Sequence, residues 1–262
     1  MMTVSLYDWN QKSGMIINMA NIVDVMFAVN KQEEGIYVII EVIALTKDDV
    51  LEAEQCGYDR VELVSAIEED GLTPDIDLLR SIINEKPSIR VQVMVRPHDN
   101  GFYYSKQDTQ QILQDFQELH RLGINHFVFG ALNEDGSINE QILQQIEAIS
   151  TDIRITFHRA IDYSNDLQTS YQTLATYPNL VERVLTSGGA PDCIQGKDQI
   201  LRLIQLADQL DGPVIMPGSG LQLSNLLSFH DTVQAKEYHI GKGVRREKSY
   251  DHPFVQRPME WK

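Results

Sequence analysis

The residues best suited to chemistry are acids, an arginine and a histidine placed in or just after short apolar segments. Glu41 and Glu62 lie within such segments. Arg96 follows one directly, and His158 ends another. Carboxyl and imidazole groups transfer protons in enzymes, while a guanidinium group binds anions through several N–H donors. If folding brings these side chains together, the pattern predicts acid–base chemistry on a small anionic molecule.

One of these residues has charged neighbours that strengthen its candidacy. A single histidine is usually a structural hydrogen-bonding group, but His158 is followed by Arg159 and Asp162. A histidine oriented by such groups is a plausible acid or base. The candidate catalytic residues are Glu41, Glu62, Arg96, His158 and Asp162.

The elements that must position these residues are short strands that alternate with longer helical segments. Eight segments rich in apolar, mostly β-branched residues predict strands. They are Val38–Val42, Arg60–Leu63, Arg90–Val95, His126–Phe129, Arg154–His158, Arg183–Thr186, Pro213–Met216 and Glu237–His239. Between them, segments with helical periodicity end before a glycine, which favours the left-handed conformation that terminates helices. Examples are Lys47–Cys56 before Gly57, Lys106–Leu122 before Gly123, and Asp198–Leu210 before Gly212.

This alternation predicts an α/β protein with a parallel sheet. Eight βα units in one chain of this length favour a single-domain (β/α)₈ barrel of the TIM type over residues 38–262. An open, doubly wound sheet is the alternative, but it usually has fewer strands and a glycine-rich first turn, and no such turn follows Val42.

Strand alternation then predicts which side chains point into the barrel. In the third strand, Gln92, Met94 and Arg96 share one side and valines share the other. Because the apolar side packs against helices, the polar side faces inward. The same rule turns inward Glu41, Arg60, Glu62, Thr156, His158, Thr186, Glu237 and His239. In such barrels, functional groups gather where the strands end.

Buried charges of this kind have two explanations. A structural lattice could pair Glu62 with Arg60 or Arg96, and Glu41 with His158. A ligand site is the other explanation, and the clustering of charge at the functional face favours it. Two glycine-bearing turns, 186–189 and 217–220, could hold a phosphate through backbone N–H groups or could simply need glycine for a tight turn. The candidate ligand-binding residues are Arg60, Thr156, Thr186, Ser187, Gly188, Gly218, Gly220 and His239.

Composition narrows the classes of partner. The chain has 262 residues, a formal charge of −16 and 42% hydrophobic residues, so it can bury a large core. Its negative charge disfavours nucleic acids and anionic membranes as partners. The two cysteines, Cys56 and Cys193, have no metal-binding spacing and fit a reducing, cytoplasmic compartment.

The first 37 residues are predicted to be an extension that is not part of the barrel. Their apolar segment is too short to span a bilayer and contains an acid. The peptide Gln32-Glu33-Glu34-Gly35 is what a purine-rich ribosome-binding sequence would encode, and Val38 follows at the spacing of a start codon. We therefore expect translation to begin near Val38.

Several motifs resemble those of the CutC copper homeostasis family, in the family's order. They are Asp59-Arg60-Val61-Glu62-Leu63, Gly71-Leu72-Thr73-Pro74, Met94-Val95-Arg96-Pro97, Phe129-Gly130-Ala131-Leu132, Thr156-Phe157-His158-Arg159-Ala160-Ile161-Asp162 and Leu185-Thr186-Ser187-Gly188. The resemblance implies a TIM-type barrel, a cytoplasmic location, and a homodimer or larger homo-oligomer. It also implies a role in copper homeostasis, with cysteine ligands at the ends of the first two strands.

At those two positions this sequence has Ile43 and Val64, which cannot bind copper. Cu(I) prefers sulfur ligands, and Met94 is the only sulfur on the predicted inward polar face. Two functions therefore remain open: a role in copper tolerance, implied by the resemblance, and an enzyme for a small carboxylated or phosphorylated metabolite, predicted from the residues.

Overall fold

The computed structural model describes residues 37–259 and residue 261. The chain divides into two compact units, residues 38–257 and residues 1–37 with 258–262. The larger unit contains all the strands and helices discussed below. The predicted N-terminal extension lies, apart from Tyr37, outside the described residues.

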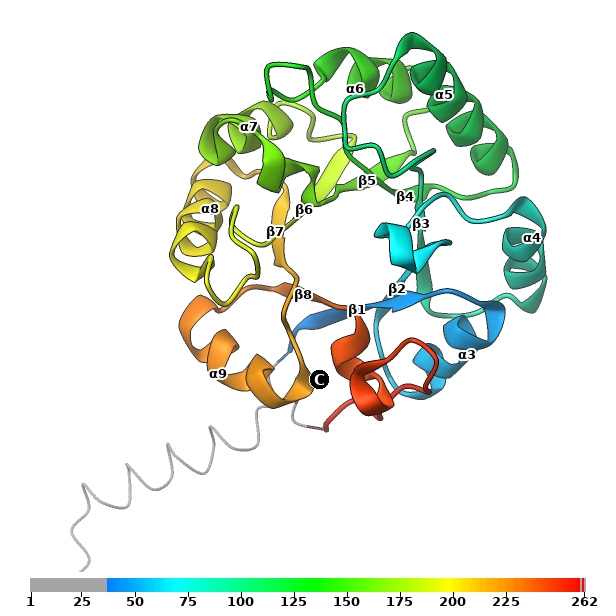
Figure 1. Cartoon of the computed structure of the whole chain (residues 1–262), viewed down its shortest axis with the longest axis vertical. Coiled ribbons are helices and arrows are strands. Elements are labelled where there is room, and N and C mark those ends of the chain that lie inside the picture. Colours follow the sequence, from blue (N-terminus) through cyan, green and yellow to red (C-terminus); the bar gives the residue numbers. More distant parts are fainter. Residues whose placement is uncertain (1–36, 260, 262) are drawn as a thin grey trace, which may run out of the picture. The chain divides into compact units, whose positions relative to one another are not determined.

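The larger unit is a nearly closed barrel of eight parallel strands (Figure 1). The strands are β1 Ile39–Ala44, β2 Arg60–Leu63, β3 Arg90–Met94, β4 His126–Phe129, β5 Arg154–Phe157, β6 Val181–Thr186, β7 Val214–Pro217 and β8 Glu237–Ile240. The pairing is continuous from β7 through β1 to β8, because β1 pairs with both β2 and β8. The predicted (β/α)₈ barrel is thus confirmed.

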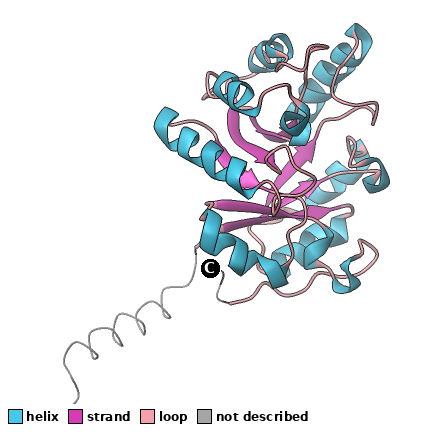
Figure 2. Cartoon of the chain, turned by 60° about the vertical axis from the view of Figure 1, so that its left-hand side comes forward, coloured by secondary structure: helices cyan, strands magenta, loops and turns pink. Residues whose placement is uncertain are grey.

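Seven α-helices of this unit surround the strands (Figures 1 and 2). They are α3 Lys47–Gln55, α4 Ile76–Glu85, α5 Lys106–Arg121, α6 Glu140–Glu147, α7 Leu167–Leu174, α8 Lys197–Leu210 and α9 Leu223–Val233. Local sequence defines where they begin: Thr46 with Asp49 forms a capping box on α3, and Ser105 with Asp108 forms one on α5.

The packing layer between strands and helices is apolar. Phe116 of α5 lies with its ring 4.7 Å from that of Phe127 and 5.6 Å from that of Phe129, both on β4. All three are fully buried. Because alternate residues of β4 point to this layer, Val128 between them points into the barrel, where it packs with Met94. Within the described residues, no helix is long and apolar enough to cross a membrane.

The three predicted helices agree with the structure to within one residue, but one terminator differs. Gly57 and Gly123 adopt positive φ, as predicted. At the end of α8, Asp211 takes the left-handed conformation with a φ of 48°, and Gly212 does not. Gly212 is required for space instead, since a Cβ there would lie 2.5 Å from the hydroxyl of Tyr171.

The segment after β8 returns over the end of β1 and is held there by a buried arginine. Arg245 donates to the carboxylate of Asp49 at 2.8 Å and to the carbonyl of Ile43 at 3.1 Å. Its guanidinium also lies 3.9 Å from the ring centre of Phe254. These contacts position two short 3₁₀ turns, Lys242–Val244 and Arg246–Lys248, at the end of the barrel.

Candidate functional site

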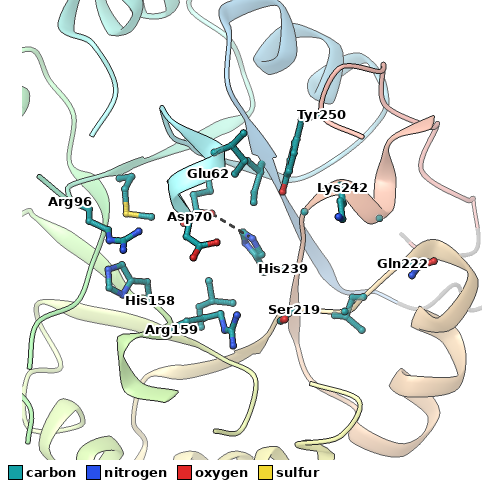
Figure 3. A pocket seen from close by; sticks show the side chains of 18 of the residues that line it. Glu62, Asp70, Arg96, His158, Arg159, Ser219, Gln222, His239, Lys242 and Tyr250 are labelled. Carbon is teal, nitrogen blue, oxygen red and sulfur yellow. Dashed lines mark ion pairs between the residues drawn. The ribbon is translucent and has the colours of Figure 1, made fainter. Parts of the chain in front are cut away.

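A cavity of about 520 Å³ opens where the strands end (Figure 3). Five of the predicted site residues line it: Glu62, Arg96, His158, Gly220 and His239. They come from β2 and β8 and from the segments that follow β3, β5 and β7. Strand alternation therefore brought the acid, the arginine and the two histidines to one cavity.

The charge of the cavity lining is opposite in sign to that of the whole chain. Four cationic side chains line it: Arg96, Arg159, Lys242 and Lys248. Among the residues that the structure describes, only Glu62 and Asp70 supply carboxyl groups to this lining. In a chain with a formal charge of −16, such a concentration of cations favours an anionic ligand.

Below the cavity, the barrel interior holds a lattice of paired charges. Arg60 donates to Glu41 and to Glu237, both at 2.5 Å. Arg183 donates to the same Glu237 at 2.9 Å and to the hydroxyl of Thr156 at 3.2 Å. A structural lattice thus exists, but neither of the expected pairs, Glu62 with an arginine and Glu41 with His158, is part of it. Arg60 and Thr156 belong to this lattice and do not line the cavity.

Glu41 is the carboxylate at the base of this arrangement and is fully buried. Burial opposes its ionisation, but Arg60 and then His239 outweigh that effect and lower its pKa to about 2. A carboxylate this firmly ionised and paired does not exchange protons near neutral pH. Its contacts therefore support a structural and orienting role in place of the expected catalytic one.

His239 links this lattice to the cavity. Its Nδ1 lies 2.8 Å from Oε1 of Glu41, and its Nε2 lies 3.5 Å from Oε2 of Glu62. Burial would lower its pKa, but Glu62 and Glu41 together raise it. The imidazole is thereby held in place between two carboxyl groups.

The pKa of Glu62 is shifted in the opposite direction from that of Glu41. Burial raises its pKa to about 7, with His239 opposing the shift and Glu41 adding to it. Among the described residues, no arginine lies within hydrogen-bonding distance of the Glu62 carboxyl group. A carboxyl group that titrates near neutral pH and faces a cavity is suited to transfer protons.

The surroundings of His158 favour the neutral form of its ring. Its Nδ1 accepts a hydrogen bond from the backbone N–H of Ala160 at 3.1 Å, which leaves the ring hydrogen on Nε2. Burial, and then the charge of Arg96, lower its pKa to about 3. The sequence predicted an acid or base here, but this environment makes His158 a hydrogen-bond donor.

Arg96 is held by the backbone that follows β2. Its Nη1 donates to the carbonyls of Glu69 at 2.9 Å and Gly71 at 3.3 Å. The guanidinium carbon lies 5.2 Å from the ring centre of Phe102. Arg96 is therefore fixed without a carboxylate partner among the described residues, so its charge is available to a ligand.

Asp162 has a structural role that the sequence did not predict. It accepts hydrogen bonds from Arg159 at 2.9 Å and from the backbone N–H groups of Ser187 and Gly189 at 3.0 and 3.1 Å. The hydroxyl of Thr186 also donates to it. Asp162 does not line the cavity. It clamps the loop after β6 and orients Arg159, which does line the cavity.

Thr186, Ser187 and Gly188 do not lie where the sequence predicted them. Arg183 and Leu185 of β6 face the barrel interior and the cavity, so Thr186 points to the outer side and binds Asp162. Alternation was ambiguous in this strand because it has polar residues on both sides. Ser187 donates to Asp162, and Gly188 lies against the backbone of Gly196. Neither lines the cavity.

The second glycine turn reaches the cavity only in part. Gly220 lines it together with Ser219, Leu221 and Gln222. Gly218 does not, but a Cβ there would lie 2.5 Å from Leu185 and 3.2 Å from His239. This glycine therefore leaves room mainly for the side chain of Leu185 and for the close approach of His239.

Other lining residues were missing from the predicted site. Asp70 belongs to the segment after β2, while Lys242, Lys248 and Tyr250 belong to the segment after β8. The peptide Gly241-Lys242-Gly243, directly after the eighth strand, was a signal that could have identified Lys242. Lys248 and Tyr250 depend on the return of the chain around Arg245, which no local pattern indicates.

The sulfur atoms of the barrel offer little for copper. Ile43 lines the cavity and packs against a cluster that contains Val64 and Met94. Neither Cys56 nor Cys193 is a lining residue, and Cys193 is fully buried. Within the described residues, no group of three or more His, Cys, Asp or Glu side chains has a metal-binding arrangement.

Comparison with known proteins agrees with the motifs. Residues 38–244 match the model of the CutC family. A family protein CutC from Salmonella schwarzengrund is 35% identical over 206 residues, covering 79% of this chain and 80% of the relative. A human copper homeostasis protein cutC homolog is 35% identical over 209 residues, covering 80% of this chain and 75% of the relative.

A solved structure agrees at the level of fold. The crystal structure of a CutC from Streptococcus agalactiae superposes with a TM-score of 0.71 and 22% sequence identity, covering 78% of this chain and 98% of the other. The segment that matches the family model, residues 38–244, includes every strand of the barrel. This chain belongs to the CutC family.

Proposed function

We propose that this protein is an enzyme that transfers a proton on a small anionic metabolite bound in the cavity. The observation that carries the proposal is the position of Glu62, which faces the cavity from β2 and contacts His239 at 3.5 Å. A carboxyl group with a pKa near 7 can take up and release a proton without a large energetic cost at either step.

His239 and Glu41 support Glu62 from below. The Nδ1 contact with Glu41 fixes the ring, so that Nε2 is directed at Glu62. A cationic imidazole stabilises the ionised carboxylate, and Glu41 in turn stabilises the imidazolium. When Glu62 gains a proton from the substrate it loses its negative charge, while the Glu41–His239 ion pair stays neutral overall.

The cationic lining would bind the substrate. Arg159 is oriented by Asp162, and Lys242 lies on the segment after β8 (Figure 3). Lys248, from the same segment, also lines the cavity. The exposed lysines attract a carboxylate or a phosphate, while Arg96 is buried and lies beside His158 (Figure 3). This arrangement supports a substrate whose anionic group lies at the rim and whose reacting part lies at the floor.

A copper function is linked to this chain through the name of its relatives. The donors that line the cavity do not fit Cu(I), because Met94 supplies the only sulfur among the described lining residues and four cationic side chains line the same cavity. A metal cation would be repelled by these charges. We therefore assign no step of the proposed reaction to copper.

The proposal is tested by thermal-shift measurements with pyruvate, 2-oxoglutarate, phosphoglycolate and inorganic phosphate. We expect at least one anion to raise the melting temperature of the wild type and to lose that effect in the double variant Arg159→Gln, Lys242→Gln. The matched control is Lys197→Gln, which removes an exposed charge on α8 outside the cavity. An anion effect that survives in the double variant, or the absence of any effect, contradicts the proposal.

A further inference from the structure

Two N–H donors in the cavity lining make no hydrogen bond to any part of the chain that the structure describes. Nε2 of His158 and Nε of Arg96 are both buried, and neither makes a hydrogen bond within the described structure. Each side chain is 5% exposed, and both line the cavity, where they lie beside each other (Figure 3). Buried donors are almost always satisfied, so two adjacent exceptions indicate a ligand atom that accepts from them.

The orientation of the His158 ring is fixed on three sides. The N–H of Ala160 holds Nδ1, and the ring of Phe102 lies 5.0 Å away between centres. On the other side is Gly130, where a Cβ would lie 2.6 Å from Nδ1. Glycine at position 130 therefore makes room for the imidazole, which lines the cavity and has little freedom to turn.

This donor keeps its hydrogen across the physiological pH range. Burial and the charge of Arg96 lower the pKa of His158 to about 3, so the ring is a neutral donor. A neutral donor next to a guanidinium suits an oxygen that is uncharged in the bound substrate and gains negative charge during the reaction. A carbonyl oxygen that becomes an enolate oxygen is such an atom.

We propose that His158 and Arg96 hold the carbonyl oxygen of a small anionic carbonyl compound while Glu62 removes a proton from the adjacent carbon. This inference rests on the proposed function and names its substrate class. The C–H bond breaks and its proton goes to the Glu62 carboxylate. Its electron pair forms the new C=C bond, and the π pair of the carbonyl moves onto oxygen as the enolate. Return of the proton regenerates Glu62, so no oxidant or reductant is needed.

The rim supports the rest of this substrate. Arg159, Lys242 and Lys248 would bind its carboxylate or phosphate group, while the aromatic ring of Phe102 covers the carbonyl end of the cavity. Glu62, on β2, lies across the cavity from His158, which directly follows β5 (Figure 3). A donor and a base on opposite sides can act on adjacent atoms of one planar molecule.

The first test needs no ligand. In full-length protein labelled with ¹⁵N-histidine, two-bond ¹H–¹⁵N spectra distinguish the two tautomers and the cation, and His158→Gln assigns the resonance. We expect a neutral ring with its hydrogen on Nε2 throughout the range from about pH 5 to about pH 8. A cationic ring, or a hydrogen on Nδ1, overturns the inference but leaves the role of Glu62 intact.

The second test compares oxalate, which resembles a bound enolate, with oxamate, which resembles the ground-state carbonyl acid. Calorimetric titration should show tighter binding of oxalate, and His158→Leu should reduce the oxalate-to-oxamate affinity ratio about tenfold or more. His158→Gln, whose amide N–H can replace the ring donor, should keep most of the ratio. Lys242→Gln should weaken both probes and change the ratio much less.

The outcomes separate the two levels of proposal. If both probes bind wild-type protein and the ratio is the same in His158→Leu, the carbonyl assignment is wrong while the anion site stands. If neither probe binds, the proposed anionic site itself is contradicted, and this inference falls with it. Circular dichroism and the melting temperature of each variant show whether it is folded.

Discussion

Glu41 and Glu62 contact opposite nitrogens of the His239 ring, and their pKa values are shifted in opposite directions. Glu41, at 2.8 Å from Nδ1, has a pKa lowered to about 2, whereas Glu62, at 3.5 Å from Nε2, has a pKa raised to about 7. Glu41 has Arg60 as a second partner, and Glu62 has no such partner among the described residues. One imidazole thus separates a structural carboxylate from one that can exchange a proton.

Loss of Glu41 should therefore be costly. Glu41→Gln leaves Arg60 without one of its two carboxylates and His239 without its Nδ1 partner, so we expect the free energy of unfolding to fall by about 3 to 5 kcal/mol near neutral pH. Urea denaturation measures this change. The control Glu118→Gln, on the exposed face of α5, should change it by less than about 0.5 kcal/mol. Equal stability of the two variants would show that the lattice contributes nothing.

Loss of Glu62 should have an effect that depends on pH. Because its pKa is higher in the folded state than the ordinary 4.5, folded protein binds the extra proton between about pH 4.5 and 7, and wild-type stability falls as the pH rises through that window. His239, whose pKa is also raised, adds a decrease above its ordinary 6.5. Both groups therefore act in the same direction.

Glu62→Gln removes the carboxyl contribution, which is on the order of 3 kcal/mol. The variant should be no more stable than wild type near pH 5 and more stable near pH 8. Urea denaturation across this range measures the difference, and Glu68→Gln on the neighbouring exposed turn is the control. A constant difference at all pH values would contradict the assignment of a raised pKa to Glu62.

Strand alternation made much of the candidate site predictable. Glu41, Glu62, Arg96 and His158 were expected to share one pocket. Glu62, Arg96 and His158 line one cavity, as does His239, because alternate residues of a barrel strand point inward, whereas Glu41 lies below it and is not a lining residue. The chemical roles of these residues were harder to predict from the sequence. Whether a buried carboxyl group ionises depends on which partner it meets across the barrel, as Glu41 and Glu62 demonstrate.

Other parts of the site depend on tertiary contacts. Asp162 accepts hydrogen bonds from the loop after β6, so its function is set by a segment about 25 residues later in the chain. Lys248 and Tyr250 reach the cavity because Arg245 anchors the returning chain on Asp49 and Ile43. No periodic pattern encodes these contacts, so the sequence alone did not reveal them.

The copper question can be answered by a gain of function. Wild-type protein should not compete with a chromogenic Cu(I) chelator, and Met94→Leu should make no difference. The double variant Ile43→Cys, Val64→Cys should compete, because Ile43 packs against the cluster that contains Val64 and two thiolates there would provide soft ligands. Tight stoichiometric binding by wild type that disappears in Met94→Leu would refute our description of the cavity.

The central claim is that Glu62 transfers a substrate proton, and solvent isotope exchange tests it most directly. From the thermal-shift panel, we choose the anion that has a carbon-bound hydrogen and stabilises the protein most. This anion is incubated with the protein in D₂O, and its proton signals are followed by NMR. Wild-type protein and the Glu68→Gln control should incorporate deuterium at similar rates. Glu62→Gln should be slower by about 100-fold or more while still binding the anion. Exchange at the wild-type rate in Glu62→Gln would contradict the account.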